Sequence, residues 1–379
     1  MVVIFVPKET ADGETRVSAV PETVKGMLKL GLEVEVERGA GAAAGFSDSE
    51  YEAAGARLVG PERRANADMV FGIQPPTAAL AREQKAGSLL ICTLMPGQHL
   101  DAVKALRAAK VTAMGLEFMP RITRAQKMDI LSSQATCGGY QAVLLAAVHL
   151  PKMFPLMMTA AGTLTPAKVL VLGAGVAGLQ AISTARKLGA VVEANDIRPA
   201  VKEQVESLGA KFVDTGTPPE AETKGGYAKE TTAEFLKKQR ETLATHIAAA
   251  DVLITTALVP GKKAPVLVTA DMRKGMRPGS VIVDMAAGQG GNVEGTVPGQ
   301  RAVVDGVTII GDTNLPAQCA ADASRTFARN VLAFLGEFVK DGKANVNMEN
   351  EILGAVSIVH DGVVRHEPTA QAVAASGGQ

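Results

Sequence analysis

Short runs of hydrophobic residues alternate with stretches of helical periodicity from the start of the chain. Two such stretches, Pro21–Leu30 and Leu100–Lys110, carry apolar residues at the spacing of an amphipathic helix. The hydrophobic runs around them predict strands at Val2–Val6, Leu32–Val36, Asp68–Ile73, Leu89–Cys92 and Val111–Met114. Strands that alternate with helices form a parallel sheet, because each parallel connection needs a crossover helix. The first part of the chain is therefore predicted to be an α/β domain.

A second series of strands begins near the middle of the chain. Its hydrophobic runs are Lys168–Gly173, Val191–Asp196, Asp251–Thr255 and Ser280–Asp284, and two long helical stretches, Leu131–His149 and Ala320–Lys340, flank the series. The predicted fold is α/β, with two doubly wound parallel-sheet (Rossmann-like) domains, the second inserted in the first and joined to it by long helices. The first domain is expected at residues 1–131 plus 315–379, and the second at residues 132–314.

Three further segments have patterns of their own. Apolar alternation on both sides of Asp361-Gly362 predicts a terminal β-hairpin over Ile352–His366. Residues 214–229 are rich in Gly, Pro, Thr and charge without periodicity, which predicts an exposed and mobile loop in the second domain. The last residues, Ala374–Gln379, are expected to fray.

Composition narrows the class of protein. At 379 residues the chain is longer than a single core normally grows, and Lys+Arg and Asp+Glu balance at 39 each, so no net field attracts nucleic acid. The most apolar stretch, Val143–Leu164, is interrupted by His149, Pro151, Lys152 and Pro155, so no membrane span is expected. The three cysteines form no CxxC pair and no secretory leader precedes them, which favours a reducing, cytosolic setting. None of the five histidines has metal-ligand or triad spacing, so no metal site is expected.

The strongest chemical motif is a glycine-rich turn after the first strand of the second series, with the sequence G-A-G-V-A-G. Gly173 would allow the tight turn, Gly175 would let the backbone approach a pyrophosphate, and Gly178 would let the following helix lie close to the sheet. The first helical residues, Val176 and Ala177, would direct unpaired N–H groups and a partial positive charge at the phosphates. These features predict a dinucleotide site.

The segment after this turn strengthens the prediction. The predicted helix Val176–Leu188 is followed by a second strand that ends in Asp196, next to Ile197 and Arg198. An acidic side chain there would accept hydrogen bonds from the adenosine ribose and repel a 2′-phosphate, which favours NAD over NADP. Arg198 leaves the alternative open, because an arginine beside that carboxylate could hold a 2′-phosphate.

A second glycine-rich segment, Gly39–Ala44, fits a relaxed form of the same pattern and also follows a strand. No helix opens within it, and Ser47 and Asp48 have the character of caps for a later helix. The next segment, Pro61–Arg64, is not a strand that ends in an acid. We therefore interpret Gly39–Ala44 as a close-packed turn, with a second nucleotide site as the alternative.

One long segment, Met119–Gln134, has the sequence MPRITRAQKMDILSSQ. It closely resembles the NAD(H)-binding subunits of proton-translocating nicotinamide nucleotide transhydrogenases. Further runs that resemble the same family cover much of the chain: Val6–Glu9, Met158–Thr163, Lys202–Gly209, Gly225–Glu230, Thr255–Lys262 and Ala320–Ser324. Matching runs of this length are specific to the family.

The resemblance implies that a loop in this segment holds the nicotinamide end of the cofactor, through Arg121, Gln126, Asp129 and Ser132. Ser132 and Arg121 would orient the carboxamide and ribose, Asp129 would brace Arg121, and Gln126 would face the incoming partner. Such residue types suit hydride transfer, which needs fixed geometry rather than a protein nucleophile. From spacing alone, a polar linker with an Arg–Asp ion pair explains the same residues.

The resemblance adds three residues to the candidate cofactor contacts, namely Tyr227, Ala257 and Leu258. Tyr227 would lie on a mobile loop that closes over the adenosine side of the nucleotide, although a tyrosine beside two glycines in a polar loop is also common at an ordinary surface. Gln134, Asp284 and Asn314 lie near strand ends or in matching runs and receive no role.

The implied function is NADH presentation for direct hydride transfer to NADP⁺ bound on a partner subunit. NADH would bind in the cleft between the two domains. The implied assembly is a homodimer that joins membrane-spanning and NADP(H)-binding subunits and stays peripheral to the cytoplasmic face of the membrane.

Two alternatives remain. The overall pattern also resembles alanine dehydrogenase, including Arg16-Val17. Its substrate lysine, catalytic histidine and acid correspond here to Gln74, Met95 and Gly288, which cannot supply the acid–base chemistry of that reaction. A catalytically idle NAD-sensing module is the other alternative, and the intact Arg-Gln-Asp-Ser loop argues against it.

Overall fold

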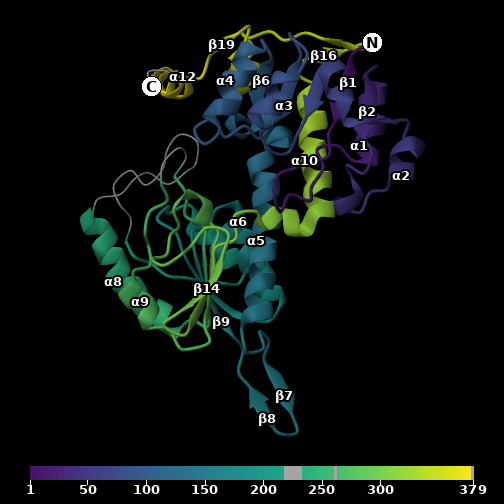
Figure 1. The fold of residues 1–379 in the computed structure, drawn as a ribbon. Coiled ribbons are helices and arrows are strands. Elements are labelled where there is room, and N and C mark those ends of the chain that lie inside the picture. The colour runs from purple at the N-terminus through teal and green to yellow at the C-terminus, as the bar shows by residue number, and fades with distance from the viewer. Residues whose placement is uncertain (217–232, 260–262, 377–379) are drawn as a thin grey trace. The chain divides into compact units, whose positions relative to one another are not determined.

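The computed structural model describes residues 1–216, 233–259 and 263–376, which form two compact units (Figure 1). Unit 1 comprises Met1–Gln134 and Ala317–Gln379, and unit 2 comprises Ala135–Pro316. The boundaries expected from the sequence lie at residues 131/132 and 314/315. The chain passes from unit 1 to unit 2 within helix α5 (Ile130–His149) and returns within the 3-10 helix η6 (Leu315–Cys319).

Unit 1 contains an eight-stranded sheet of order β19-β18-β6-β5-β4-β1-β2-β3. Its strands are β1 (Val3–Val6), β2 (Glu33–Glu37), β3 (Arg57–Val59), β4 (Met69–Phe71), β5 (Leu89–Cys92), β6 (Thr112–Gly115), β18 (Ser357–His360) and β19 (Val363–Val364). The first six are parallel, whereas β18 is antiparallel to β6 and β19 to β18. The five predicted strands are confirmed. The sequence pattern missed β3, a three-residue edge strand without a fully buried side chain.

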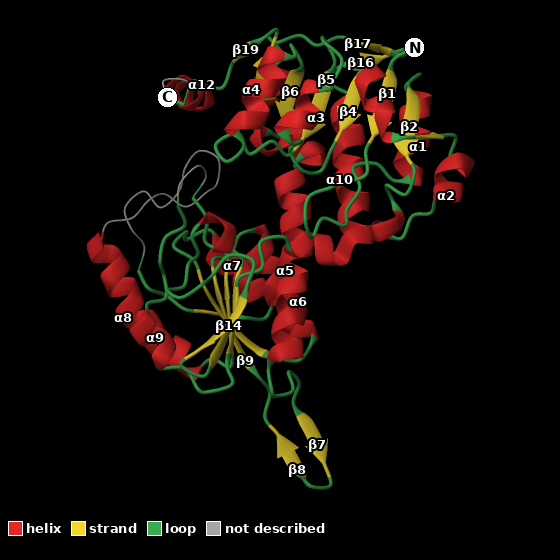
Figure 2. Ribbon diagram, viewed as in Figure 1, coloured by secondary structure: helices red, strands yellow, loops and turns green. Residues whose placement is uncertain are grey.

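Helices cover both faces of this sheet (Figure 2). They are α1 (Pro21–Lys29), α2 (Asp48–Ala53), α3 (Ala78–Arg82), α4 (Leu100–Ala108), α10 (Ala320–Leu335), α11 (Glu351–Val356) and α12 (Glu367–Ala375). Neighbouring side chains of β1 point to opposite faces, so Ile4 and Val6 join one core with residues of α1, α10 and α11. Phe5 joins the other core with residues of α3, α4 and α12. The alternation therefore builds two cores from one strand.

The turn at Gly39–Ala44 is close-packed, as predicted. A Cβ atom on Gly41 would lie 2.6 Å from the ring of Tyr51, which is fully buried. The segment contains a single 3-10 turn, η1 (Ala42–Ala44), and the next α-helix, α2, begins after Ser47. The Ser47 hydroxyl accepts a hydrogen bond from the Glu50 N–H, which confirms Ser47 as a helix cap.

Two predictions near the C-terminus are wrong in part. The predicted helix Ala320–Lys340 ends at Leu335, because the chain turns at Gly336 into a small hairpin of β16 (Val339–Lys340) and β17 (Lys343–Ala344). The predicted hairpin Ile352–His366 is confirmed only for β18 and β19, whose turn at Asp361 and Gly362 has positive φ.

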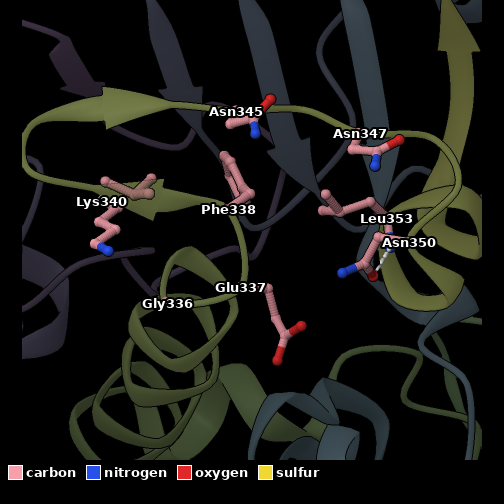
Figure 3. A pocket seen from close by; sticks show the side chains of 9 residues that line it. Gly336, Glu337, Phe338, Lys340, Asn345, Asn347, Asn350 and Leu353 are labelled. Atoms are coloured by element: carbon pink, nitrogen blue, oxygen red, sulfur yellow. Dashed lines mark hydrogen bonds between the residues drawn. The ribbon is translucent and has the colours of Figure 1, made fainter.

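The first part of that predicted hairpin is instead the helix α11. The Asn350 side chain caps this helix by accepting hydrogen bonds from the N–H groups of Ile352 and Leu353. Figure 3 shows the bond with Leu353. Ile352, Leu353 and Val356 are buried at helical spacing. A short apolar run of this kind is compatible with either a helix or a strand. The sequence signal that favours a helix here is the capping residue Asn350.

Unit 2 contains a seven-stranded sheet of order β11-β10-β9-β12-β13-β15-β14. Its strands are β9 (Lys168–Leu172), β10 (Val191–Asn195), β11 (Lys211–Phe212), β12 (Val252–Thr255), β13 (Val281–Asp284), β14 (Arg301–Val304) and β15 (Val307–Ile310). Every neighbouring pair is parallel except β14 with β15. The four strands predicted for this region are confirmed. A doubly wound sheet of this order places its ligand at the carboxyl ends of the central strands.

Helices α5, α6 (Val176–Lys187) and α7 (Val201–Ser207) share one core with this sheet, and α8 (Ala233–Ala249) shares the other. A short helix, α9 (Ala270–Lys274), follows the strand β12. The long helix predicted at Leu131–His149 and the helix predicted at Val176–Leu188 are both confirmed. Among the described residues, no helix has the length and apolar character that a membrane crossing requires.

A hairpin that the sequence pattern did not predict protrudes from the rest of unit 2 (Figure 1). Its strands are β7 (Met157–Thr159) and β8 (Gly162–Leu164), and all six strand residues are exposed. Prolines break the apolar run that precedes it, so periodicity gave no signal. Most of the loop predicted at residues 214–229 lies outside the described residues.

Candidate functional site

The carboxyl ends of three neighbouring strands in unit 2 meet at one edge of the sheet. β9 lies between β10 and β12, and all three strands are parallel. Gly173 follows β9, Asp196 follows β10, and Thr256 follows β12. The strand order reverses at β9, and such a switch point is where doubly wound sheets bind their ligands.

Two glycines of the glycine-rich turn have no room for a side chain, Gly173 because of the end of β12 and Gly178 because of the turn itself. Gly173 has φ +95°, and a Cβ atom there would lie 2.5 Å from the Thr256 hydroxyl. That hydroxyl donates a 2.9 Å hydrogen bond to the Gly173 carbonyl. A Cβ atom on Gly178 would lie 1.9 Å from the same carbonyl oxygen, so helix α6 can begin here only with glycine at 178.

Gly175 differs from these two glycines, because the space beside it is open. A Cβ atom on Gly175 would have the Arg198 Nη2 atom as its nearest neighbour, at 3.9 Å. No described side chain caps α6, whose first residue, Val176, is 42% exposed. The N–H groups of Val176 and Ala177 at this helix start therefore suit an anion, and the helix dipole adds a partial positive charge.

Asp196 is the acidic residue that the motif predicts, and it is already engaged within the protein. Its Oδ1 atom accepts hydrogen bonds of 2.9 Å from the N–H and the Nε of Arg198. Its Oδ2 atom accepts from Arg198 Nη2 at 2.9 Å and from the Ala174 N–H at 2.8 Å. Burial raises the pKa of Asp196, but Arg198 and these N–H groups outweigh it, so the pKa is lowered and the carboxylate stays charged.

The pairing with Asp196 bears on whether Arg198 could hold a 2′-phosphate, a question that the sequence leaves open. The guanidinium is held by Asp196 in a bidentate pair, so part of the negative charge that would repel a 2′-phosphate is neutralised. A ribose hydroxyl that binds Asp196 must share the carboxylate with Arg198. Ile197, between them, is half-buried.

Ala257 and Leu258 follow β12, as predicted, and a buried asparagine fixes the position of Ala257. The Asn292 Oδ1 atom accepts from the Ala257 N–H at 3.0 Å, and its Nδ2 atom donates to the Ala257 carbonyl at 2.8 Å. Both backbone polar groups of Ala257 are thus occupied. A ligand would meet Ala257 through its apolar surface.

Asn292 is itself held by Asp284, which is fully buried at the end of β13. The Asp284 carboxylate accepts hydrogen bonds from the N–H groups of Ala286, Asn292 and Val293 and from the hydroxyls of Thr255 and Thr296. The sequence predicts no role for Asp284 and does not single out Asn292. The only signal was a pair of glycines before Asn292, which is typical of a tight turn.

The residues expected to hold the nicotinamide lie in unit 1, on the 3-10 helix η4 (Thr123–Met128) and the segments next to it. Arg121 and Gln126 are exposed, and Asp129 and Ser132 are half-buried. Asp129 caps the first turn of α5: its carboxylate accepts from the Ser132 hydroxyl at 2.6 Å and from the Ser132 N–H at 3.0 Å. The structure therefore brings Asp129 and Ser132 together. Tyr227 lies outside the described residues.

Unit 1 also contains a buried ion pair that contacts the start of α5. The Arg16 guanidinium binds both carboxylate oxygens of Glu14, at 2.8 and 2.7 Å, and its Nη1 donates to Gln134 at 2.7 Å. Gln74 donates to Glu14 at 2.8 Å. Burial raises the pKa of Glu14, but Arg16 outweighs it and lowers the pKa to about 2.

Two further carboxyl groups, those of the half-buried residues Glu9 and Glu117, lie near the carboxyl ends of β1 and β6. Glu9 accepts from the Ile73 N–H at 2.5 Å, and Glu117 accepts from the N–H groups of Leu94 and Met95. Burial is the largest influence on each and raises both pKa values, that of Glu9 to about 7. In the parts of the chain that the structure describes, no group of three or more His, Cys, Asp or Glu side chains could hold a metal ion.

A glycine-rich turn between a strand and a helix, with an acidic residue at the end of the next strand, defines a Rossmann-like dinucleotide-binding domain. Comparison with known proteins gives the family. The family model "Alanine dehydrogenase/PNT, N-terminal domain" matches residues 5–138, and "Alanine dehydrogenase/PNT, C-terminal domain" matches residues 142–367. The chain belongs to the alanine dehydrogenase/PNT family.

Within this family, the chain is similar over nearly its whole length to transhydrogenase alpha subunits. It is 49% identical over 374 residues to a Rhodospirillum rubrum protein whose name gives it as a part of NAD(P) transhydrogenase subunit alpha, covering 96% of this chain and 97% of that protein. The crystal structure of transhydrogenase from Sinorhizobium meliloti matches with a TM-score of 0.85 and 42% identity, covering 97% of this chain and 99% of that one. A structure of L-alanine dehydrogenase matches with a TM-score of 0.81 and 27% identity, covering 99% of both chains.

Replacing Asp196 tests the nucleotide site. We expect Asp196→Ala to weaken NADH binding about tenfold or more, because a hydrogen bond to a charged group contributes about 1.5–3 kcal/mol. Loss of the carboxylate that repels a 2′-phosphate should at the same time improve binding of NADPH relative to NADH. Fluorescence titration with both nucleotides measures the two changes, and an unchanged NADH affinity would show that the ribose is held elsewhere.

Replacing Glu9 tests the buried carboxyl of unit 1. The folded pKa of about 7 lies above the ordinary value of 4.5, so folding favours the protonated form. The free energy of unfolding should therefore fall as pH rises from about 4.5 to about 7, and Glu9→Gln should lack this part of the slope. Urea unfolding of both proteins from about pH 5 to about pH 8 measures the difference, and parallel curves would rule out the raised pKa.

Proposed function

We propose that the chain binds NAD(H) on unit 2 and presents it for direct hydride transfer to NADP⁺ on a partner subunit, within a proton-translocating nicotinamide nucleotide transhydrogenase. The observation that carries this proposal is the dinucleotide site at Gly173–Gly178 and Asp196, in a chain that is similar to a transhydrogenase subunit over 96% of its length. The pyrophosphate would bind at the start of α6. The adenosine ribose would bind at Asp196.

The chemistry asks little of the protein beyond geometry. The hydride moves between two nicotinamide rings, so no side chain has to act as a nucleophile or carry a proton. The protein must hold the rings in a near-attack arrangement. In our proposal Ser132 and Arg121 orient the carboxamide and ribose, Asp129 supports them, and Gln126 faces the partner.

Several observations on these residues support the assignment. The Ser132 hydroxyl is fixed on Asp129, which gives it one defined direction. Gln126 is exposed, as a residue that meets a second protein must be. Ala257, with both backbone groups held by Asn292, is suited to pack against an apolar ring edge. Tyr227 is proposed to close over the adenosine side.

Alanine dehydrogenase activity is supported less well. That reaction needs cationic groups that clamp a substrate carboxylate and a general acid or base. Here the one arginine at the matching place, Arg16, is 7% exposed and already holds Glu14. An incoming carboxylate would have to displace Glu14. Gln74 and Met95 add neither a cation nor a titratable group.

We also propose that the working form is a homodimer that attaches to membrane-spanning and NADP(H)-binding subunits on the cytoplasmic face. The support is a group of exposed apolar residues on and before the hairpin β7–β8, which consists of Met153, Leu156, Met157, Met158 and Leu164. A cluster of this kind marks a protein-binding surface.

The dimer proposal has a direct test. Met158 is 77% exposed, and Met158→Asp should shift the chain from dimer to monomer in sedimentation velocity, because it places a charge in an apolar contact. Val303 is 70% exposed on another edge of unit 2, so Val303→Asp is the matched control and should remain dimeric. A Met158→Asp dimer as stable as the parent would exclude this surface.

Hydride transfer tests the main proposal. The purified chain is mixed with the NADPH-loaded partner subunit and a spectrally shifted NAD analogue, and reduction of the analogue is followed. We expect transfer by the parent chain, and transfer about tenfold slower by Gln126→Asn, which shortens a positioning group by one methylene. NADH affinity of this variant should stay within about twofold of the parent, because the phosphate and ribose sites are untouched.

The same components, with the partner subunit present or left out, separate the other functions. Tight NADH binding without any analogue reduction would favour a sensor and contradict our proposal. NADH formation from NAD⁺ and alanine, without a partner subunit, would favour alanine dehydrogenase. A large loss of NADH affinity in Gln126→Asn would show that Gln126 binds the nucleotide instead of facing the partner.

A further inference from the structure

The buried face of helix α10 carries one amide among large apolar side chains. Phe327, Val331 and Phe334 are fully buried on this face, and Asn330 between them is 8% exposed. A buried amide is costly unless each of its polar atoms finds a partner. The partners of Asn330 therefore indicate what the residue is for.

Both ends of the Asn330 side chain bind the segment that carries the proposed nicotinamide contacts. Its Nδ2 atom donates to the Lys127 carbonyl at 2.8 Å, and its Oδ1 atom accepts from the Ser133 hydroxyl at 2.7 Å. Lys127 lies in η4 and Ser133 in the first turn of α5. The two contacts thus bracket Asp129 and Ser132 on either side.

A second layer of hydrogen bonds holds the same turn. Gln134 donates to the Ser133 hydroxyl at 3.3 Å and to the Ala323 carbonyl of α10 at 3.0 Å, and it accepts from Arg16 at 2.7 Å. Arg16 is in turn fixed by Glu14. The start of α5 is therefore tied to α10 and to the N-terminal segment, and Asn330 is the member of this network that reaches across to η4.

We propose that Asn330 is a positioning residue for hydride transfer, which sets the distance between η4 and the first turn of α5 and so the placement of Gln126, Asp129 and Ser132. This inference rests on the proposed function. A backbone carbonyl near the end of a short 3-10 helix has no intrahelical partner of its own, and the Asn330 amide supplies one. Near-attack geometry is sensitive to displacements of about 1 Å, which loss of this contact could produce.

Asn330→Asp isolates the contact. At a pH high enough to ionise this buried acid, the carboxylate has nearly the same size and still accepts from Ser133, but it cannot donate to the Lys127 carbonyl and its charge repels that oxygen. We expect hydride transfer to slow about tenfold or more. The Kd for NADH should stay within about twofold of the parent value, because the glycine turn and Asp196 belong to unit 2.

A matched control exists in the same unit. Asn350 uses its side-chain oxygen to accept from two N–H groups at the start of α11, and its side-chain nitrogen donates to none of the described residues. Asn350→Asp makes the same chemical change while keeping this cap, since aspartate is an equally good N-cap residue. Its hydride transfer rate should equal that of the parent chain.

Hydrogen exchange gives a readout that does not depend on catalysis. The backbone amides of residues 123–129 should exchange faster in Asn330→Asp than in the parent chain. Their exchange rates should be unchanged in Asn350→Asp. Should Asn330→Asp fail to fold, Ser133→Ala removes the other contact of Asn330, and we expect a smaller loss of rate at constant NADH affinity.

The outcomes separate the two proposals. A parent chain that transfers no hydride contradicts the proposed function and with it the catalytic meaning of Asn330. An active parent with an equally active Asn330→Asp overturns only the positioning role. A loss of rate matched by an equal loss of NADH affinity also overturns it, because general disruption would then explain both.

Discussion

A side chain at position 178 would have to occupy the place of the Gly173 carbonyl oxygen, 1.9 Å from its Cβ atom. Glycine at 178 lets helix α6 begin directly against the end of β9. The same closeness recurs on the other side of the turn, where a Cβ atom on Gly139 of α5 would lie 2.2 Å from the Ala177 carbonyl. The start of α6 therefore packs between a strand end and a helix, and the space beside Gly175, the residue that precedes it, is open. The placement of the proposed cofactor depends on this packing.

Loops without regular backbone partners are held by buried side chains in both units. In unit 2, the Asn292 side chain forms hydrogen bonds with the N–H and the carbonyl of Ala257, as a neighbouring strand would. The Asp284 carboxylate in turn accepts a hydrogen bond from the Asn292 N–H and so fixes the turn that carries Asn292. In unit 1, Asn330 performs the same task for the Lys127 carbonyl. When one partner of a buried hydrogen bond is lost, the polar group that remains is left unsatisfied, at a cost of about 1–3 kcal/mol. Such networks fix a loop in one arrangement, which suits a reaction governed by geometry.

Local patterns in the sequence predicted much of this architecture. Strands such as β9 and β12 are mainly continuous apolar runs, as expected for strands buried on both faces. Gly173 and Gly178 in the glycine-rich turn indicate a backbone that leaves no room for side chains there. The edge strand β3 and the hairpin β7–β8 have too few buried residues to produce a pattern. The sequence predicts a strand where helix α11 lies, because a short apolar run fits either element. Asp196 could be predicted from its place after β10, whereas its bidentate pairing with Arg198 could not.

The residues that support the site were beyond prediction for a different reason. Asn292 and Ala257 are 35 positions apart, and Asn330 and Lys127 are 203 apart. No periodicity connects positions at such separations, and a lone asparagine in a helix carries no sign of a distant carbonyl. Resemblance to a family supplied Arg121, Gln126, Asp129 and Ser132, and only the folded chain links their segment to α10.

A crystal structure of the chain with NADH bound would locate the cofactor. We expect electron density for the pyrophosphate beside Gly175, within hydrogen-bonding distance of the Val176 and Ala177 N–H groups, and for the adenosine ribose at Asp196. Density for the dinucleotide at any other place, or an empty edge of β9 at saturating NADH, would contradict this placement.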